Sequence, residues 1–249
     1  LLQIARLEPA PRPKSKPRVL FVCGSLNQTT QMHQIASALG DGIEAVYTPF
    51  YGDHWVLKLA RQLGWVDITI AGYKRRRICL AYLTQRGMRI DLHAEHDASS
   101  YDLVVTANDQ VEPRNLAAVP KVLVQEGILD PPTWLFRLWR ATEAFPRVFA
   151  GTTTMGQSHS YARFCVASEG YRDYFASLGV DSDKMVVTGI PNFDRCDHFR
   201  DNDFPHRDFV LCCTSDARET FMKQERAALL RRVRDEARGR QVIFKLHPN

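Results

Sequence analysis

The feature that most constrains the fold is a repeated pattern in which a short apolar run ends in polar residues and a helix-like segment follows. RVLFVCGS at 18–25 is the first such run, and apolar residues at helical spacing follow it at 29–40. A continuous apolar run indicates a strand buried on both faces of a sheet. The pattern recurs at 44–64, 101–127, 163–179 and 184–194. The sequence therefore predicts an α/β protein with a Rossmann-like parallel sheet.

The chain divides into three parts by composition. Residues 1–17 are rich in Pro, Lys and Arg, which is typical of a linker or arm. Residues 18–196 form the predicted Rossmann-like domain, which we expect to be the acceptor-side domain. Residues 197–249 contain a polar connection followed by a predicted strand, helix and strand. Since one such unit cannot cover its own sheet, we expect it to start a second Rossmann-like domain that continues beyond Asn249.

Composition argues against several other classes of protein. Hydrophobic residues make up 45% of the 249 residues and charged residues 24%, which is typical of a folded globular chain. The net charge of +5 comes largely from KRRR at 74–77 and from arginines at 229–240 that acidic residues interrupt. No basic groove pattern with interleaved aromatics occurs, so no nucleic-acid partner is expected. The six cysteines lack a CxxC pair, which favours a reducing, cytoplasmic location and no metal site.

Polar residues follow the first predicted strand. Gly24, Ser25 and Asn27 precede or open a helix, where free backbone N–H groups favour an anion or a sugar hydroxyl. The spacing lacks the second glycine of a dinucleotide-binding fingerprint. We therefore expect substrate binding here and no resident cofactor. For Thr29 and Thr30, ordinary turn and capping chemistry is an equal alternative.

Two carboxylates follow later strands and are candidate catalytic residues. Asp109 ends the run YDLVVTAND, and Glu126 follows KVLVQ directly before Gly127. A partly desolvated carboxylate at a strand exit is suited to act as a general base toward a hydroxyl. Glu126 is the stronger candidate, because Gly127 leaves room for a substrate. The alternative is that Glu126 caps a helix or pairs with an arginine.

The stretch VTGIPNFD at 187–194 joins the two predicted domains. Gly189 and Pro191 impose a specific turn, and Asn192 follows them. Such a turn lies at an interdomain cleft, so we expect it to help bind the substrate. A rigid linking turn is the alternative, and the two are compatible.

Four polar residues leave the two strands of the second unit. Thr214 and Ser215 follow one strand, and Lys245 and His247 end the other. Hydroxyls, an ammonium group and an imidazole at neighbouring strand exits would suit a diphosphate. His247 titrates near neutral pH and is the candidate acid for a leaving phosphate.

These motifs resemble the GT-B superfamily, in particular UDP-N-acetylglucosamine 2-epimerases and the capsule or teichoic-acid glycosyl- and glycerophosphotransferases. The stretches that carry the resemblance span most of the chain from residue 18: RVLFVCGS, KVLVQEG, VASEGYRDYFASLGVDSDKMVVTGIPNFD and VIFKLHPN. The resemblance implies two facing Rossmann-like domains and a nucleotide-sugar donor. It also implies that Glu126 deprotonates the acceptor while Lys245 and His247 stabilise the departing nucleotide phosphate.

Departures from the epimerase motifs favour a transferase. The epimerase stretch Gly-Thr-Arg-Pro-Glu is Gly-Ser-Leu-Asn-Gln at 24–28, and Thr-His-Arg-Arg-Glu-Asn is Thr-Ser-Asp-Ala-Arg-Glu at 214–219. Related transferases carry an acidic-acidic-Gly motif. The corresponding residues of this chain are Gln125, Glu126 and Gly127, so a glutamine stands at the first acidic position. A sugar-nucleotide 2-epimerase and a binding module without turnover remain open as alternatives.

An aromatic stretch at 131–146 marks a candidate acceptor surface. Helical spacing places four apolar residues of this stretch on one face: Trp134, Leu135, Leu138 and Trp139. Such a face is suited to cover a lipid-linked acceptor or to contact a membrane alongside KRRR. This would place the protein at the inner face of the membrane. Packing in the core is the competing interpretation.

Overall fold

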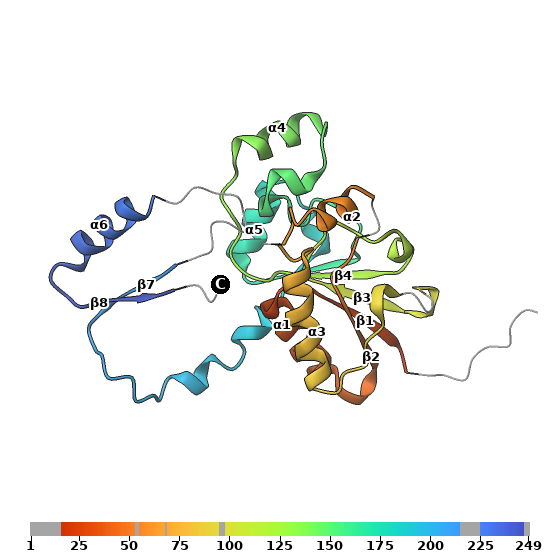
Figure 1. Cartoon of the computed structure of the whole chain (residues 1–249), viewed down its shortest axis with the longest axis horizontal. Coiled ribbons are helices and arrows are strands. Elements are labelled where there is room, and N and C mark those ends of the chain that lie inside the picture. Colours follow the sequence, from red (N-terminus) through yellow and green to blue (C-terminus); the bar gives the residue numbers. More distant parts are fainter. Residues whose placement is uncertain (1–15, 53–54, 68, 95–97, 215–224, 247–249) are drawn as a thin grey trace, which may run out of the picture.

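The structure is a computed structural model and describes residues 16–52, 55–67, 69–94, 98–214 and 225–246. Its main feature is a parallel six-stranded sheet in the order β2-β1-β3-β4-β5-β6 (Figure 1). An isolated parallel bridge from Tyr47 to Ile90 extends the β2 edge. The strands are β1 Arg18–Cys23, β2 Glu44–Pro49, β3 Leu103–Thr106, β4 Lys121–Val124, β5 Arg163–Val166 and β6 Met185–Val187.

Strand order locates the edge at which ligands are expected. The chain runs outward from β1 to β2 and then returns to β3 on the other side of β1. In open parallel sheets, ligands bind outside the carboxyl ends of the strands at such a reversal. The exits of β1, β3 and β4 are therefore the positions where a functional site is expected.

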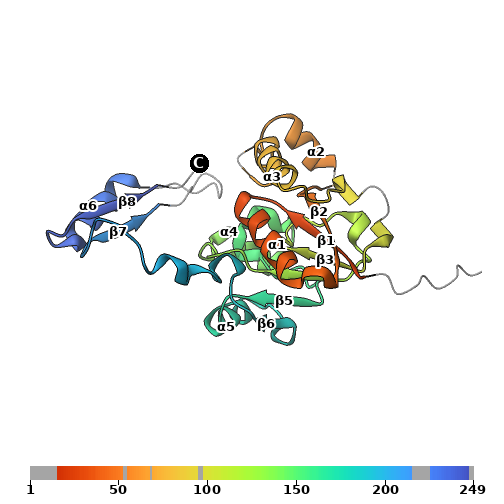
Figure 2. The ribbon, with the colours of Figure 1, turned by 90° about the horizontal axis from the view of Figure 1, so that it is seen from below.

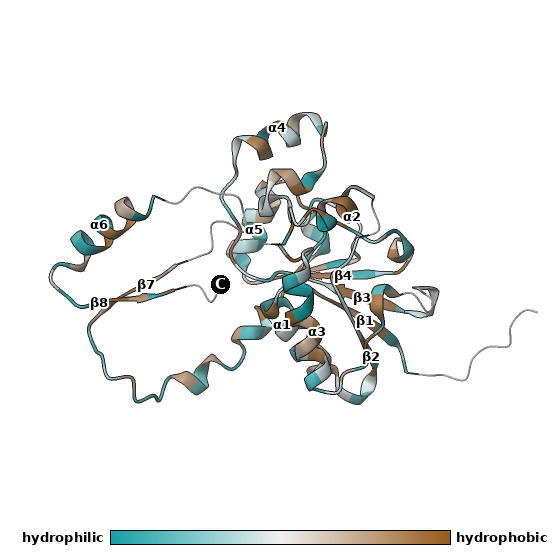
Figure 3. Cartoon of the chain, viewed as in Figure 1, coloured by the Kyte–Doolittle hydropathy of each residue, from teal (hydrophilic) through white to brown (hydrophobic). Residues whose placement is uncertain are grey.

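Helices and turns cover both faces of this sheet. The helices are α1 Leu26–Leu39, α2 Trp55–Gln62, α3 Tyr73–Gln85, α4 Trp134–Thr142 and α5 Glu169–Ser177. Alternate residues of β1 point to opposite faces, as the pleat requires. Phe21 packs with α1 and α3, whereas Leu20 and Val22 pack on the other side with Leu57 of α2. Figure 3 shows the central strands β1 and β3 largely in brown, the colour of hydrophobic residues.

A second, two-stranded parallel sheet follows. It contains β7 Val210–Cys213 and β8 Val242–Lys245, joined by α6 Arg226–Ala237. Figures 1 and 2 show this unit to one side of the six-stranded sheet. The apolar runs predict strands here, as observed, but Leu211 is 52% and Phe244 39% exposed. The division of the chain into domains at residue 197 stays a prediction.

The sequence prediction of an α/β fold is confirmed, and the differences lie at helix starts. The helix α1 begins at Leu26 rather than at residue 29, because Ser25 caps it with the help of Gln28. The helix α3 begins at Tyr73 and so includes the basic run KRRR at 74–77. No helix in the described part of the chain is long and apolar enough to cross a bilayer.

Replacement of Phe164 by Ala should destabilise the β5 side of the sheet. Phe164 is fully buried, and its ring contacts that of Phe175 with centroids 4.7 Å apart. Loss of this side chain leaves a cavity and should lower the free energy of unfolding by about 3–5 kcal/mol in urea titration. The control Phe193→Ala removes a ring that is 61% exposed and should cost about 0.5 kcal/mol or less. Equal losses in the two variants would contradict this account of the core.

Candidate functional site

Glu126 lies at the centre of a cluster of polar side chains from two strand exits. It follows β4, and its carboxylate accepts hydrogen bonds from three side chains at the start of α1. Oε1 accepts from Ser25 Oγ at 3.0 Å and from Asn27 Nδ2 at 3.0 Å. Oε2 accepts from Gln28 Nε2 at 2.6 Å. The exits of β1 and β4, far apart in sequence, are thereby joined at the edge of the sheet.

The local sequence explains why α1 presents these donors. Ser25 Oγ accepts from the Gln28 N–H at 3.1 Å, and Gln28 Oε1 accepts from the Ser25 N–H at 3.3 Å. A Cβ atom at Gly24 would lie 1.8 Å from Gln28 Oε1, so glycine is required where Gln28 folds back. The positive end of the α1 dipole also favours a carboxylate here. Glu126 thus takes the place at the helix start that the sequence predicts for an anion.

Two buried amides fix the backbone that carries Glu126. Gln125 is fully buried: its Oε1 accepts from the Ala167 N–H at 2.8 Å, and its Nε2 donates to the Gly127 carbonyl at 2.9 Å. The carbonyl of Gln125 accepts from Nε2 of buried Gln31 at 2.8 Å. Gln125 therefore links the exits of β4 and β5.

Asn192 ties the turn after β6 to the same helix. It lies in the short 3-10 helix Pro191–Phe193, just after Gly189, whose φ of 84° is one that side chains rarely allow. Asn192 Nδ2 donates to the backbone and side-chain oxygens of Asn27 at 2.9 and 2.7 Å. Its Oδ1 accepts from Gln34 Nε2 at 3.0 Å and from Thr30 Oγ1 at 3.3 Å. The segment that leads toward β7 is therefore attached to the helix that holds Glu126.

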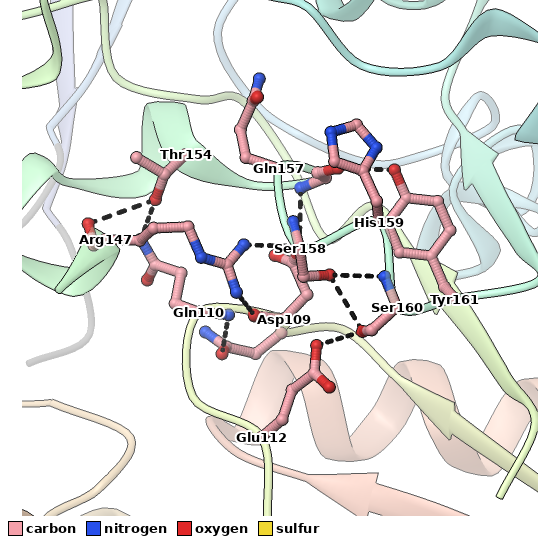
Figure 4. Close-up of polar contacts among 12 residues, drawn as sticks. Asp109, Gln110, Glu112, Arg147, Thr154, Gln157, Ser158, His159, Ser160 and Tyr161 are labelled. Carbon is pink, nitrogen blue, oxygen red and sulfur yellow. Dashed lines mark hydrogen bonds and ion pairs between the residues drawn. The ribbon is translucent and has the colours of Figure 1, made fainter. Parts of the chain in front are cut away.

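The second predicted carboxylate, Asp109, has different surroundings (Figure 4). It is 3% exposed, and its Oδ2 accepts from Arg147 Nη1 at 3.3 Å and from the N–H groups of Gly156 and Ser158 at 3.1 Å each. Arg147 Nη2 also donates to the Asp109 carbonyl at 2.7 Å. The hydroxyl of Tyr161 closes this loop by donating to the Gly156 carbonyl at 2.6 Å. These contacts hold the loop after residue 155, and the catalytic role of Asp109 stays a prediction.

Burial and charge raise the pKa of a tyrosine in the Asp109 loop. Desolvation is the largest cause of the upward shift in the pKa of Tyr161, and the negative charge of Asp109 adds to it. The phenol therefore stays protonated and keeps donating to Gly156 through the neutral range. A hydrogen-bond donor that stays neutral in this range suits a structural loop.

The second sheet brings together part of the predicted phosphate site. Cys213 and Lys245 are paired in the ladder, and the Thr214 N–H donates to the Lys245 carbonyl at 3.0 Å. Thr214 and Lys245 are thus neighbours at the exits of β7 and β8. Ser215 and His247 lie outside the described residues. Among the residues described, no group of three or more His, Cys, Asp or Glu is placed to hold a metal ion.

The site residues that sequence reasoning missed are amides. Ser25, Asn27 and Glu126 are each indicated separately by the sequence, and the structure joins them; Gln28, Gln31 and Gln34 were not singled out. The one available signal was the Ser25-x-x-Gln28 spacing of a capping box, which identifies Gln28 alone.

Gly127 lies directly after Glu126, and its substrate-binding role stays a prediction. Apart from the two chain neighbours of Gly127, no described residue has an atom within 4 Å of the position that a Cβ would take there. The backbone next to Glu126 is therefore open on this side.

The sheet, its strand order and the cluster at the strand exits define a Rossmann-like α/β protein. No family model and no curated protein matches the chain. Solved structures that are similar include the UDP-N-acetylglucosamine 2-epimerase of Rickettsia bellii, at 12% identity and a TM-score of 0.46, covering 94% of this chain and 63% of that one. HepE from Anabaena in complex with UDP-glucose matches at 12% identity and a TM-score of 0.45, covering 93% and 69%.

The wall teichoic acid polymerase TagF is also similar, at 12% identity and a TM-score of 0.43, covering 93% of this chain and 56% of that one. The chain thus spans less than two thirds of the epimerase and of the polymerase.

Replacement of Asp109 by Asn should destabilise the protein because Arg147 and two N–H groups lose a charged acceptor. Breaking a buried ion pair from one side should cost about 3 kcal/mol in urea unfolding. The matched control is Asp173→Asn, which makes the same charge change on the exposed surface of α5. It should cost about 0.5 kcal/mol or less. A loss for Asp109→Asn no larger than that of the control would refute the structural role.

Proposed function

We propose that the protein is a GT-B-type transferase that moves a nucleotide-activated sugar or glycerophosphate to an acceptor hydroxyl in cell-surface polysaccharide synthesis. The observation that carries the proposal is the Glu126 carboxylate, which is half-buried at the carboxyl edge of the sheet and held by three neutral side chains. Glu126 is the glutamate of the stretch KVLVQEG, one of those on which the sequence resemblance rests.

The partners of Glu126 fit a general base. Ser25, Asn27 and Gln28 orient the carboxylate without neutralising it, since none of the three carries a charge. In contrast, Asp109 is paired with Arg147. A base must reach the hydroxyl proton and keep room to accept it. Gly127, with open space beside it, provides the approach to Glu126.

Donor binding is assigned to the second sheet. Thr214 and Lys245 are adjacent at its strand exits, and the predicted partners Ser215 and His247 complete the proposed set. Lys245 would balance phosphate charge, and His247 would protonate the leaving phosphate oxygen. Gly189, Pro191 and Asn192 connect the two sheets and are proposed to contact the donor. No resident cofactor enters this reaction.

Glu126→Gln should abolish most of the turnover. The glutamine keeps the size of the side chain but has no negative charge to accept the proton, so kcat should fall about a hundredfold to ten-thousandfold while KM changes little. Release of nucleotide from UDP-glucose, UDP-N-acetylglucosamine and CDP-glycerol is the measurement. The control is Glu169→Gln at the exit of β5, an exposed carboxylate paired with Arg172. Unchanged kcat in Glu126→Gln would reject Glu126 as the base.

The same donors separate the competing functions. Formation of the 2-epimer of UDP-N-acetylglucosamine without acceptor would replace the transferase proposal with an epimerase. Calorimetric binding of nucleoside diphosphates without any turnover would favour a binding module. Transfer that depends on an added glycan or lipid-linked acceptor is the result expected here.

A further inference from the structure

Two helices of this protein share one five-residue pattern at their first turns. The helix α2 begins with WVLKL at 55–59, and α4 begins with WLFRL at 134–138. Each contains Trp, two apolar residues, a cation and Leu in that order. The two helices follow the exits of β2 and β4, so both leave the same edge of the sheet as Glu126.

The shared residues have matching exposures. Trp55 is 69% and Trp134 is 70% exposed, and Leu59 and Leu138 are each 45% exposed. Residues four apart lie on the same face of a helix, so each Trp and Leu form one outward apolar strip. The inward faces are different: Leu57 packs on the sheet, and Phe136 and Trp139 are buried. Each helix is therefore apolar on its inner and outer sides at once.

This arrangement corrects the sequence expectation for 131–146. The spacing there predicts one helical face shared by four residues, Trp134, Leu135, Leu138 and Trp139. In the structure Trp139 is 8% exposed and belongs to the core, whereas Trp134 and Leu138 face outward. Packing in the core accounts for Phe136 and Trp139 of α4. It does not account for apolar side chains at the exposed positions Trp134 and Leu138.

Each strip continues beyond its first turn and is bordered by cations. Leu63 and Trp65 extend the α2 strip, being 52% and 69% exposed, and Phe149, which follows α4, is 63% exposed. Lys58 and Arg137 are exposed between the Trp and the Leu of their helices. Figure 1 draws both helices in its upper half, and Figure 2 shows that they lie at different depths of that view.

A basic cavity lies beside the α4 strip. It has a volume of about 420 Å³, and it is lined by Pro132, Phe136, Arg137, Arg140, Ala141 and Leu178. A lining that combines two arginines with apolar side chains suits a phosphate group with the first methylenes of a lipid. The charge of this cavity is complementary to an anionic phospholipid headgroup.

We propose that α2 and α4 form a two-point contact with an anionic phospholipid bilayer. Trp55 and Trp134 enter the interface, Leu59 and Leu138 lie beneath them, and Lys58, Arg137 and Arg140 meet lipid phosphates. Tryptophan at the end of an amphipathic helix and cations on its flank are the features that hold a helix in the plane of a bilayer surface. The contact goes beyond the proposed reaction, because bilayer binding requires no turnover.

Vesicle sedimentation of the whole chain tests this surface. The protein should bind phosphatidylcholine vesicles that contain about 30% phosphatidylglycerol, and binding should weaken with salt and fall strongly on pure phosphatidylcholine. The double variant Trp55→Ser, Trp134→Ser should lower the partition coefficient at least about tenfold. So should Lys58→Glu, Arg137→Glu. The control Phe199→Ser changes a ring that is 76% exposed outside both helices and should leave binding unaltered.

Failure of the wild-type chain to bind anionic vesicles would overturn the proposal, and would indicate a protein partner for the strips. Equal binding of the double tryptophan variant and the control would also overturn it. Circular dichroism of each variant checks that the fold is retained. Since the readout is sedimentation, a negative result leaves the transferase proposal intact with a water-soluble acceptor, and loss of turnover in Glu126→Gln leaves the bilayer contact intact.

Discussion

The contact between the Glu126 carboxylate and the first turn of α1 organises the rest of the candidate site. It joins the exits of β1 and β4, which the intervening strand β3 separates in the sheet. The contact depends on Gly24, since a side chain there would displace Gln28 from both Ser25 and Glu126. A carboxylate at a helix start is favourable electrostatically, and the three side chains of the described residues that donate to Glu126 are all uncharged.

Asp109 and Glu126 both lie at strand exits, but their carboxylates have different surroundings. Asp109 is buried, accepts two backbone N–H groups and is paired with Arg147, so its charge is used to fix a loop. Glu126 is half-buried and accepts from neutral side chains, so its charge is oriented and still reachable from solvent. Composition at the exit is similar in the two cases. Burial and the neighbouring cation distinguish them, and both depend on residues distant in the sequence.

The sequence was sufficient to predict the strands and the exits, because a buried parallel strand requires a continuous apolar run and a polar residue where it ends. It identified Ser25, Asn27, Glu126 and Asn192 one at a time. It did not predict that they meet, because this depends on strand order, and order is set by packing between segments that the chain separates. Gln31 was missed for the same reason: the fold brings the Gln125 carbonyl to this buried glutamine, and the sequence does not show that partner.

Asn192 extends the site toward the second sheet. Its Nδ2 donates hydrogen bonds to the backbone and side-chain oxygens of Asn27, and Asn27 Nδ2 donates to Glu126. A continuous chain of hydrogen bonds therefore connects the turn after β6 to the carboxylate. Gly189 allows that turn, and Pro191 restricts the start of the short helix that carries Asn192. The first turn of α1 is therefore held from β4 on one side and from the connecting segment on the other. A rearrangement of the segment from residue 193 onward would act first on Asn27, the donor through which it is connected to Glu126.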